Sequence, residues 1–519
     1  MVDWLKNAVF YEIYPQSFAD TNADGIGDIQ GIIEHLDYIK ELGCNAIWLN
    51  PCFESPFLDA GYDVSDYMKV APRYGTNADL KRLFQEVHDR DMYVMLDLVP
   101  GHTSWEHPWF QESLKPEQNA YSGRYVWTDN AWKDFEGISG TKGFLRGMSQ
   151  RDGCVAVNFY SHQPSLNYGF YEIDDPSWQQ PMDSPDALST REAIKDIMRF
   201  WLEMGCDGFR VDMAGSLVKN DPQQEGTIAL WHDFMQFIET EFPNAGMISE
   251  WGQPDRSLRS GFHMDFMLHF GPSHYTDMFH KDDPYFSREG KGDAKAFIDY
   301  YKMCYEPTNG KGMICVPSGN HDMERMTNWL DAEEVKIVYA FLLSLPGAPF
   351  IYYGDEIGMQ YLGDIVSVEG GYNRTGSRSP MQWDDGLNAG FSDADASKLY
   401  IPMDPDKNRP TAKKAVADPD SIYHEVKKLI KIRQSTPVLQ SEAKIEFLYC
   451  EDHAYPLAYR RTDGTDSLLV AVNPSGKEAS FAYDGNLGDT LYQKGGDYRL
   501  ENGTFTAAPG SAVFVWEKN

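Results

Sequence analysis

The sequence predicts an α/β protein built on a (β/α)8 (TIM) barrel, with a small inserted domain after the third strand and a C-terminal antiparallel β-sandwich. Short apolar runs alternate with helical patterns through the first four-fifths of the chain, which favours parallel strands joined by crossover helices. Polar residues follow most of these runs, and active sites gather at the carboxyl ends of barrel strands. The apolar runs are Ala8–Tyr14, Ala46–Leu49, Tyr93–Leu98, Gly208–Val211, Met247–Ser249, Met313–Val316 and Pro349–Tyr352.

Amphipathic helices are predicted between several of these runs. In Ile29–Leu42 and Ala78–Arg90 the apolar residues stand three and four positions apart, the spacing that places them on one helix face. An open doubly wound sheet also gathers ligands at strand ends. That fold rarely spreads charged residues over so many strands, and no Gly-x-Gly-x-x-Gly follows the first strand, so the barrel is favoured.

The chain divides into three predicted parts. Residues 103–168, rich in Gly, Trp, Ser and Asp, are too many for a structureless loop and are predicted to form the inserted domain. A helix from Ser421 to about Ser435 is predicted to end the barrel, which takes residues 1–102 and 169–435. Residues 436–519 form the predicted β domain. Its strand candidates are Ile445–Tyr449, Leu457–Arg461, Ser467–Val472, Ala479–Tyr483 and Ala512–Trp516.

Composition narrows the class of partner. The formal net charge of −33 over 519 residues disfavours nucleic acid and anionic lipid, and it suits neutral substrates and bound cations. The seven scattered cysteines form no zinc-binding pattern. The N-terminus lacks the features of a signal peptide, and no apolar run is long enough to span a membrane. A cytoplasmic protein with no membrane anchor is therefore expected, and its oligomeric state is left open.

Three acidic residues directly follow strand-like segments. Asp212 stands two residues after Arg210, on the same side of a strand, and the guanidinium is expected to keep the carboxylate ionised. Glu250 precedes Trp251, where partial desolvation would raise its pKa as a general acid requires. Asp322 follows an imidazole. Each acid alone is more simply explained as a helix cap or an ion-pair partner. Together on separate strands they indicate glycoside hydrolysis, which needs two carboxyl groups.

These segments resemble the four signature regions of the α-amylase family of glycoside hydrolases (glycoside hydrolase family 13), in the right order. The resemblance extends over the barrel, the insertion and the C-terminal β domain. The four segments are Asp97–His102, Gly208–Asp212, Ser249–Trp251 and Gly319–Asp322, and Gln163–Asn167 resembles the family's fifth region.

The resemblance implies a role for each acid. Asp212 would be the nucleophile that forms a β-glycosyl ester, and Glu250 would be the acid/base. Asp322 would bind the 2- and 3-hydroxyls of the reacting sugar. Arg210 would orient Asp212, and Asp97 would support Arg210 from behind.

The resemblance also implies a set of substrate-binding residues. His102 and His321 would hydrogen-bond the reacting sugar, and Tyr62 would stack under its ring. Asp59 matches an acid that binds the terminal glucose in exo-acting members. Arg378 completes the predicted substrate-binding set and begins the segment Arg378–Asp384, which is similar to the oligo-1,6-glucosidase and trehalose synthase branch.

The sequence departs from the family pattern at two positions. The first region usually carries Asn before its His, and Gly101 stands there. Because the missing side chain would normally brace the site, a local rearrangement is expected. Ser165 stands in the fifth region where Asp is common. Neither departure touches the three acids.

A calcium site is predicted near the N-terminus. Oxygen-bearing residues stand at every second position, as hard cations require, although Gly31 occupies the place of the Glu that would complete such a loop. The branch around oligo-1,6-glucosidase carries a similar loop, which implies a structural Ca²⁺. The predicted ligands are Asp20, Asn22, Asp24, Ile26 and Asp28.

The expected activity is that of a retaining hydrolase acting mainly on α-1,4 bonds of maltooligosaccharides and starch-derived maltodextrins, through a covalent glycosyl-enzyme intermediate. Linkage preference stays open, because Met213 after the nucleophile matches neither the Val typical of α-1,6-cleaving members nor the small residue or Thr of α-1,4-cleaving ones. One alternative is an α-1,6-cleaving glucosidase or a transglycosylase such as a trehalose synthase. A non-enzymatic alternative is a barrel like those of transporter subunits, which have typically lost these acids.

Overall fold

A computed structural model describes residues 2–133, 137–308 and 310–518 and contains a closed parallel barrel. Its strands pair in the order β11-β10-β9-β8-β5-β2-β1-β12, and a parallel bridge between Pro317 and Phe350 joins the two ends of this sheet. The predicted barrel is therefore confirmed. The strands are β1 (Phe10–Ile13), β2 (Ala46–Leu49), β5 (Tyr93–Leu98), β8 (Gly208–Val211), β9 (Gly246–Ser249), β10 (Met264–Phe266), β11 (Met313–Cys315) and β12 (Phe350–Tyr352).

The sequence prediction missed strand β10. Its three residues include Asp265, which is fully buried and interrupts the apolar run. The Asp265 carboxylate accepts hydrogen bonds from the Ser249 hydroxyl at 2.7 Å and from the Trp251 backbone N–H at 3.1 Å. These partners come from the end of β9, so no local signal could have reported that a charged residue belongs inside the barrel.

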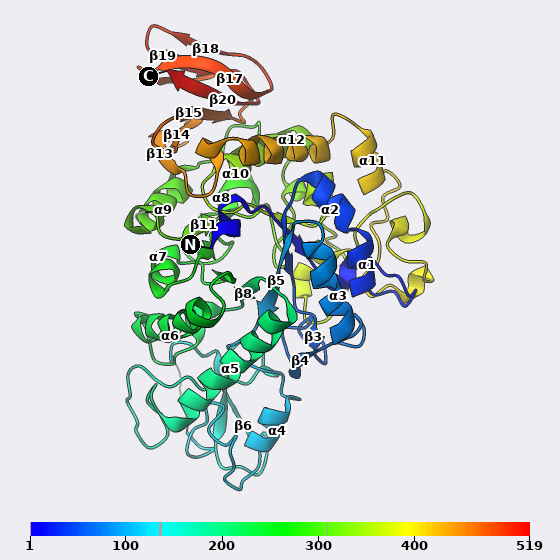
Figure 1. Ribbon diagram of the computed structural model, residues 1–519, viewed down its shortest axis with the longest axis vertical. Helices are drawn as coiled ribbons and strands as arrows, with labels where there is room; N and C mark the ends of the chain where they lie inside the picture. The colour runs from blue at the N-terminus through cyan, green and yellow to red at the C-terminus, as the bar shows by residue number, and fades with distance from the viewer. Residues whose placement is uncertain (1, 134–136, 309, 519) are drawn as a thin grey trace.

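Helices surround the barrel (Figure 1). The single helix predicted over Ile29–Leu42 is wrong, because the chain breaks at His35 into α1 (Ile29–Glu34) and α2 (Leu36–Leu42). The His35 imidazole contacts the Gly31 carbonyl oxygen and stacks on Trp383 at 3.8 Å between ring centroids. The other longer helices are α3 (Asn77–His88), α5 (Pro185–Met204), α6 (Glu225–Glu241), α9 (Lys295–Tyr305), α10 (Ala332–Ser344) and α12 (Ile422–Ser435).

The shorter helices lie in the connections between strands. They are α4 (Pro108–Ser113), α7 (Pro254–Ser257), α8 (Thr276–Phe279) and α11 (Ala412–Ala417). Side-chain caps define several helix starts. Thr76 and Asp79 form a reciprocal capping box at the start of α3, and the Ser421 side chain caps α12 at the predicted position.

The inward-facing side chains change from apolar to polar along the barrel axis. Phe10 and Phe350 stack at 4.3 Å between ring centroids, in an interior cluster that also contains Ile248. Alternate residues of a strand face the same side. Glu12 therefore follows Phe10 on the inner face of β1, and Glu250 follows Ile248 beyond the end of β9. The same alternation fills one end of the barrel and leaves polar groups at the other.

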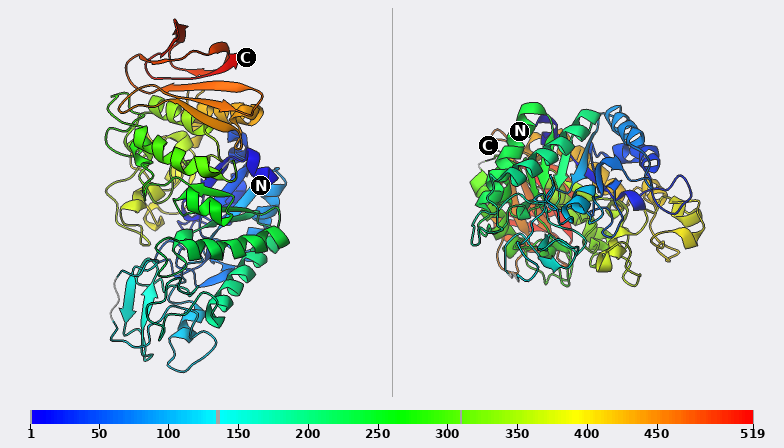
Figure 2. Two further views of the ribbon diagram at one scale, coloured as in Figure 1. Left: turned by 90° about the vertical axis from the view of Figure 1, so that its left-hand side faces the viewer. Right: turned by 90° about the horizontal axis from the view of Figure 1, so that it is seen from below.

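The inserted segment, residues 103–168, and the C-terminal β domain lie at opposite ends of the molecule (Figures 1 and 2). In the inserted segment β6 (Gly143–Arg146) pairs antiparallel with β7 (Cys154–Val157). Beside it, β3 (Phe53–Glu54) pairs with β4 (Asp66–Val70). The three-part division drawn from the sequence stays a prediction where its boundary residues are concerned.

The C-terminal domain consists of two antiparallel sheets that share a core. Leu469 of one sheet and Phe481 and Phe505 of the other belong to one apolar cluster. Three strands were not predicted: β17 and β18 are largely polar and only partly buried, and β19 is a mostly buried strand of four residues. The five-stranded sheet has β13 (Lys444–Tyr449), β14 (Leu457–Thr462), β15 (Ser467–Asn473), β20 (Ser511–Lys518) and the unpredicted β17 (Asn486–Lys494). The other sheet has β16 (Ala479–Ala482) with the unpredicted β18 (Tyr498–Glu501) and β19 (Thr504–Ala507).

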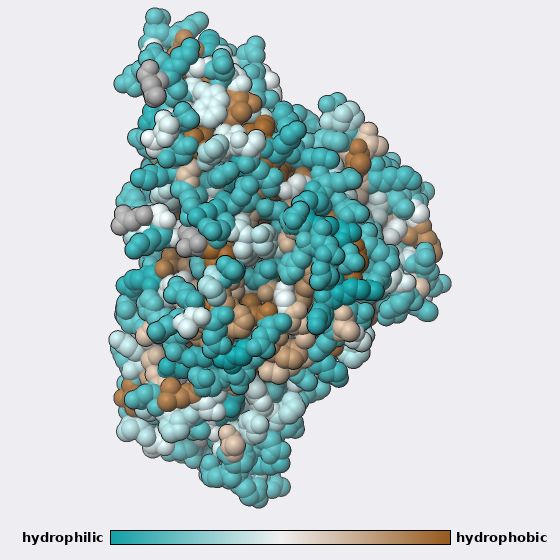
Figure 3. All heavy atoms as spheres, viewed as in Figure 1, coloured by the Kyte–Doolittle hydropathy of each residue, from teal (hydrophilic) through white to brown (hydrophobic). Residues whose placement is uncertain are grey.

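The surface agrees with the acidic composition. Most of the face shown in Figure 3 is hydrophilic. Among the described residues, none of the helices combines the length and the apolar character that crossing a bilayer requires.

One glycine gives a test of the close packing of strands β8 and β9. Gly208 begins β8 opposite Gly246 with φ of 147°, and a Cβ at Gly208 would overlap the Gly246 carbonyl oxygen. We expect Gly208→Ala to cost about 3 kcal/mol or more, or to prevent folding. Thermal melts followed by circular dichroism measure this. The matched control is Gly464→Ala, where φ is 95° and the surroundings are open, so the cost is about 1 kcal/mol. Equal melting shifts for the two variants would contradict the close approach of β8 and β9.

Candidate active site

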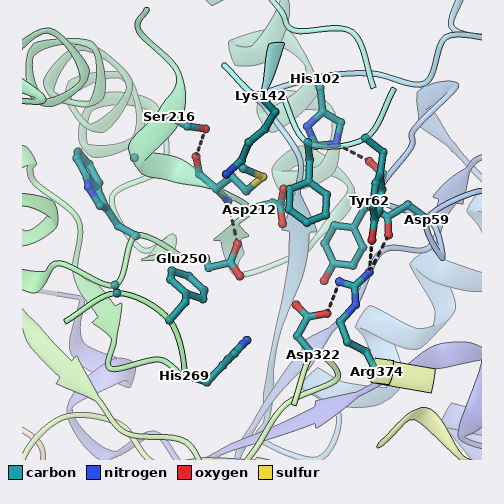
Figure 4. Close-up of a pocket in the computed structure, with 18 of the residues that line it drawn as sticks. Asp59, Tyr62, His102, Lys142, Asp212, Ser216, Glu250, His269, Asp322 and Arg374 are labelled. Atoms are coloured by element: carbon teal, nitrogen blue, oxygen red, sulfur yellow. Dashed lines mark hydrogen bonds and ion pairs between the residues drawn. The ribbon is translucent and has the colours of Figure 1, made fainter. Parts of the chain in front are cut away.

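A pocket of about 630 Å³ opens where the carboxyl ends of the barrel strands meet the inserted segment. Figure 4 shows its side chains pointing toward a common space. Six of the predicted site residues line it: Asp59, Tyr62, His102, Asp212, Glu250 and Asp322. The other four predicted catalytic and sugar-binding residues are buried, and each contacts at least one of these six: Asp97, Arg210, His321 and Arg378.

Arg210 joins three carboxylates that come from three strands. Its Nη1 lies 2.8 Å from Asp97 Oδ1 and 3.1 Å from Asp212 Oδ1, and its Nη2 lies 2.9 Å from Glu250 Oε1. The guanidinium is 2% exposed, so water screens these contacts weakly. The backbone N–H of Met213 donates to Glu250 Oε2 at 3.0 Å. Asp212 and Glu250 therefore converge on one cation, as their predicted roles require.

Burial raises the pKa of both acids, and Arg210 opposes the shift. The pKa of Glu250 rises to about 8 and that of Asp212 to about 7. The expectation that Glu250 has a raised pKa is borne out in direction. For Asp212, desolvation outweighs the attraction of Arg210, and the expectation that the guanidinium keeps this carboxylate ionised stays a prediction. The order nevertheless leaves Asp212 as the more acidic member of the pair.

The pKa of Asp322 is shifted in the opposite direction. Burial alone would raise its pKa, but attraction by His321, Arg374 and Arg378 together lowers the pKa below the ordinary value. Arg374 Nη1 and Arg378 Nη2 each lie 2.9 Å from Asp322 Oδ1. Arg374 also lies 3.5 Å from Asp59 Oδ1. Sequence reasoning missed Arg374. It lies four residues before the family-like segment Arg378–Asp384, and this closeness was the available signal.

Tyr62 lines the pocket beside these acids, and the buried His321 packs against it. The Tyr62 hydroxyl lies 2.7 Å from His321 Nε2 and donates to Asp97 Oδ2 at 3.1 Å. The two rings are nearly parallel, with centroids 5.4 Å apart. On the far side of the imidazole, Nδ1 lies 2.8 Å from Glu12 Oε1. A chain of buried polar contacts thus runs from β1 to the pocket, and Glu12 was not predicted as part of it.

Asp59 connects the pocket to the inserted segment. Its Oδ2 accepts a hydrogen bond from Gln163 Nε2 at 2.7 Å, and Gln163 begins the segment that resembles the family's fifth region. Burial raises the pKa of Asp59 to about 6, against the attraction of Arg374 and Arg378. The inserted segment therefore forms part of the pocket wall.

Aromatic rings surround the pocket mouth. Phe159, Phe270 and Tyr372 line it and remain substantially exposed, and Tyr160 and Trp251 line it beside them. Such rings cover the apolar C–H faces of sugars well. Sequence reasoning did not identify them, because aromatic residues in loops have no spacing that separates a binding surface from a core.

The predicted calcium loop folds as a row of tight turns before α1. The backbone N–H groups of Asn22 and Gly25 donate to the Asp20 carboxylate at 3.0 and 2.8 Å. Asp28 accepts from the Gly31 N–H at 2.7 Å and caps α1. Within the described ranges no group of three or more His, Cys, Asp or Glu side chains converges to hold a metal ion. The oxygen donors suit Ca²⁺ chemically, but these acids already serve the loop's own N–H groups. Calcium therefore stays a prediction.

Similar proteins fall in one enzyme family. An oligo-1,6-glucosidase of Parageobacillus thermoglucosidasius is 32% identical over 543 residues, covering 92% of each chain. A trehalose synthase/amylase TreS of Mycolicibacterium smegmatis is 32% identical over 455 residues, covering 78% of this chain and 71% of that one. The crystal structure of the trehalulose synthase MutB from Pseudomonas mesoacidophila matches with a TM-score of 0.83 at 26% identity and covers 99% of each chain.

A family model also matches most of the chain. The model of the alpha-amylase catalytic domain matches residues 12–442, a range that contains every predicted site residue. The chain therefore belongs to the α-amylase family of glycosidases, glycoside hydrolase family 13.

Proposed function

We propose that the protein is a retaining exo-acting α-glucosidase that removes terminal glucose from short α-linked oligosaccharides. The observation that carries this proposal is the contact of one buried guanidinium, Arg210, with both Asp212 and Glu250. Two carboxyl groups held this closely suit a nucleophile and an acid/base, since inverting enzymes need room for a water between the acids.

In the first step, Asp212 attacks the anomeric carbon while Glu250 protonates the glycosidic oxygen. The bond from that carbon to the leaving sugar breaks, and an ester bond to the Asp212 carboxyl forms. In the second step Glu250, now ionised, takes a proton from water, whose oxygen attacks the same carbon and releases Asp212. One negative charge thus moves from Asp212 to Glu250 while both stay beside Arg210.

The proposed exo action is argued from the polar residues around Asp59 and Asp322 in the pocket wall. Arg374 lies beside both Asp59 and Asp322, and Gln163 holds Asp59 from the inserted segment. This polar wall offers donors and acceptors to the hydroxyls of a single terminal glucose. The aromatic rings at the mouth would cover the next sugar. Short maltodextrins, linked mainly α-1,4, are the first proposed substrates.

A second candidate is cleavage of α-1,6 bonds or transfer to a sugar acceptor. It is favoured by the curated relatives, which are named oligo-1,6-glucosidase and trehalose synthase/amylase, and by a MutB variant whose structure contains the substrate sucrose. The covalent intermediate is common to these outcomes, and the acceptor decides among them.

A product profile tests the proposal. Purified enzyme is incubated with maltotriose, isomaltose, sucrose and soluble starch, and products are separated by chromatography. We expect glucose from maltotriose, with the α-configuration in the first product detected by NMR, and little action on starch. Trehalose or an isomerised sugar would instead favour the transglycosylase.

Asp212→Asn tests the nucleophile assignment, and it should lose at least about 10³-fold in rate with its melting temperature nearly unchanged. Activity of this variant within tenfold of wild type would reject Asp212 as the nucleophile.

The pH dependence of kcat/KM follows from the two pKa values. Asp212 must be ionised, so the rate falls as the pH drops through about 7. Glu250 must be protonated, so the rate also falls as the pH rises through about 8. The optimum is therefore expected between these values. With α-glucosyl fluoride, whose leaving group needs no proton, the alkaline decline should largely disappear. An optimum at pH 5 or below, toward the ordinary carboxyl pKa values of about 4, would contradict these shifts.

We also propose a structural Ca²⁺ at the loop from Asp20 to Asp28, supported by its row of oxygen donors. Melting temperatures are compared in excess calcium and in chelator. A bound ion at 100 times its Kd would stabilise the fold by about 2.7 kcal/mol, so calcium should raise the melting temperature by a few degrees. Asp24→Ala should abolish the rise. A melting temperature that ignores both calcium and chelator would remove this part of the proposal.

A further inference from the structure

The space beside Gly101 explains why this chain lacks the usual asparagine there. The Gly101 backbone lies outside the left-handed region, so its conformation does not require glycine. A Cβ at this position would lie 2.5 Å from Nδ2 of Asn158, closer than real contacts allow. The Asn158 side chain therefore fills the place into which an asparagine at position 101 would extend.

Asn158 comes from the inserted segment, one residue after β7, and is 1% exposed. Its Nδ2 donates to His102 Nδ1 at 3.1 Å. Its Oδ1 accepts from the Ser216 hydroxyl at 3.4 Å, and its Nδ2 lies 3.8 Å from the sulfur of Met213. One amide thus contacts the loops that follow β5 and β8, two neighbouring strands of the barrel.

Two contacts require the same protonation form of His102. An amide NH₂ can only donate, so Nδ1 must accept and the ring proton must lie on Nε2. Nε2 lies 3.0 Å from the Tyr62 backbone oxygen, which can only accept. Burial also lowers the pKa of His102 to about 3, so the ring stays neutral at physiological pH.

We propose that Asn158 is a positioning residue for the sugar-binding pocket. Its amide replaces the side chain that Gly101 lacks and holds His102 as the Nε2-protonated tautomer against the loop that carries Tyr62. For activity this inference rests on the proposed α-glucosidase function. It assigns the inserted segment a part in positioning the barrel's own residues, through a side chain outside all five family-like regions.

Loss of the amide would leave Nδ1 of His102 buried without a donor. The ring would then be free to change tautomer or rotate, and the anchor to the Tyr62 carbonyl would weaken. Because His102 and Tyr62 both line the pocket, the effect is expected on the organisation of the bound sugar.

Four variants test the proposal. Asn158→Asp keeps the size of the side chain but removes the donor, and Asn158→Ala removes the amide. The double variant Gly101→Asn with Asn158→Ala relocates the amide to the barrel. Thr128→Val is the control, because Thr128 is also buried in the inserted segment and donates and accepts hydrogen bonds there without contacting the pocket.

We expect Asn158→Asp and Asn158→Ala to lose about tenfold or more in kcat/KM on a p-nitrophenyl α-glucoside, mainly in kcat. The double variant should recover at least threefold over Asn158→Ala. Thr128→Val should lower the melting temperature by a similar amount while keeping the wild-type kcat. ¹⁵N NMR of histidine-labelled protein, with His102 assigned by His102→Gln, should show an unprotonated Nδ1 in the wild type and a protonated Nδ1 in Asn158→Asp.

Three results would overturn the proposal: wild-type kcat/KM in Asn158→Asp, equal impairment of Asn158→Ala and the double variant, or a loss of kcat in Thr128→Val that matches the Asn158 variants. If the wild type cleaves no α-glucoside, the proposed function fails, and the NMR comparison decides this inference alone. An unchanged His102 tautomer in Asn158→Asp would then reject it.

Discussion

The pocket depends on the burial of one guanidinium among three carboxylates. Arg210 contacts Asp97, Asp212 and Glu250, each from a different strand. In these buried surroundings an uncompensated charge would destabilise the fold strongly. Removing this cation would leave three buried acids without their common partner. The same contact suits the proposed chemistry. Since the negative charge moves between two partners of one cation, the surroundings need little reorganisation during the reaction.

The barrel supplies this arrangement through ordinary strand geometry. Side chains alternate along each strand, so the apolar layer around Phe10 and Ile248 is followed by an inward-facing polar layer. Within that layer the contacts continue from Glu12 through His321 to the Tyr62 hydroxyl, and from there to Asp97. The acids and their supports are therefore parts of one connected network, and Asp322 receives its own pair of arginines from the loop after β12.

Much of this could be predicted from the sequence, and the failures share a physical cause. Apolar runs that alternate with helical patterns identified seven of the eight barrel strands, and the motif residues do gather in one pocket. Strand β10 was missed because Asp265 finds its partners on β9. His35, at the break between α1 and α2, stacks on Trp383, far along the chain. Arg374 and Asn158 likewise act through contacts that only folding creates. Local sequence patterns indicate the secondary structure that a segment prefers. The positions and roles of these residues depend on contacts with residues distant in sequence.

The contacts of the inserted segment with the barrel bear on how such enzymes could be recombined. Gln163 reaches Asp59, and Asn158 lies where a side chain at position 101 would begin. A chimera of this barrel with an inserted segment that lacks Asn158 would carry neither amide. The reverse chimera, in which a barrel with asparagine at the position of Gly101 receives this segment, would place two amides in the same space. The glycine and the asparagine form a matched pair, so a viable graft has to move both or neither.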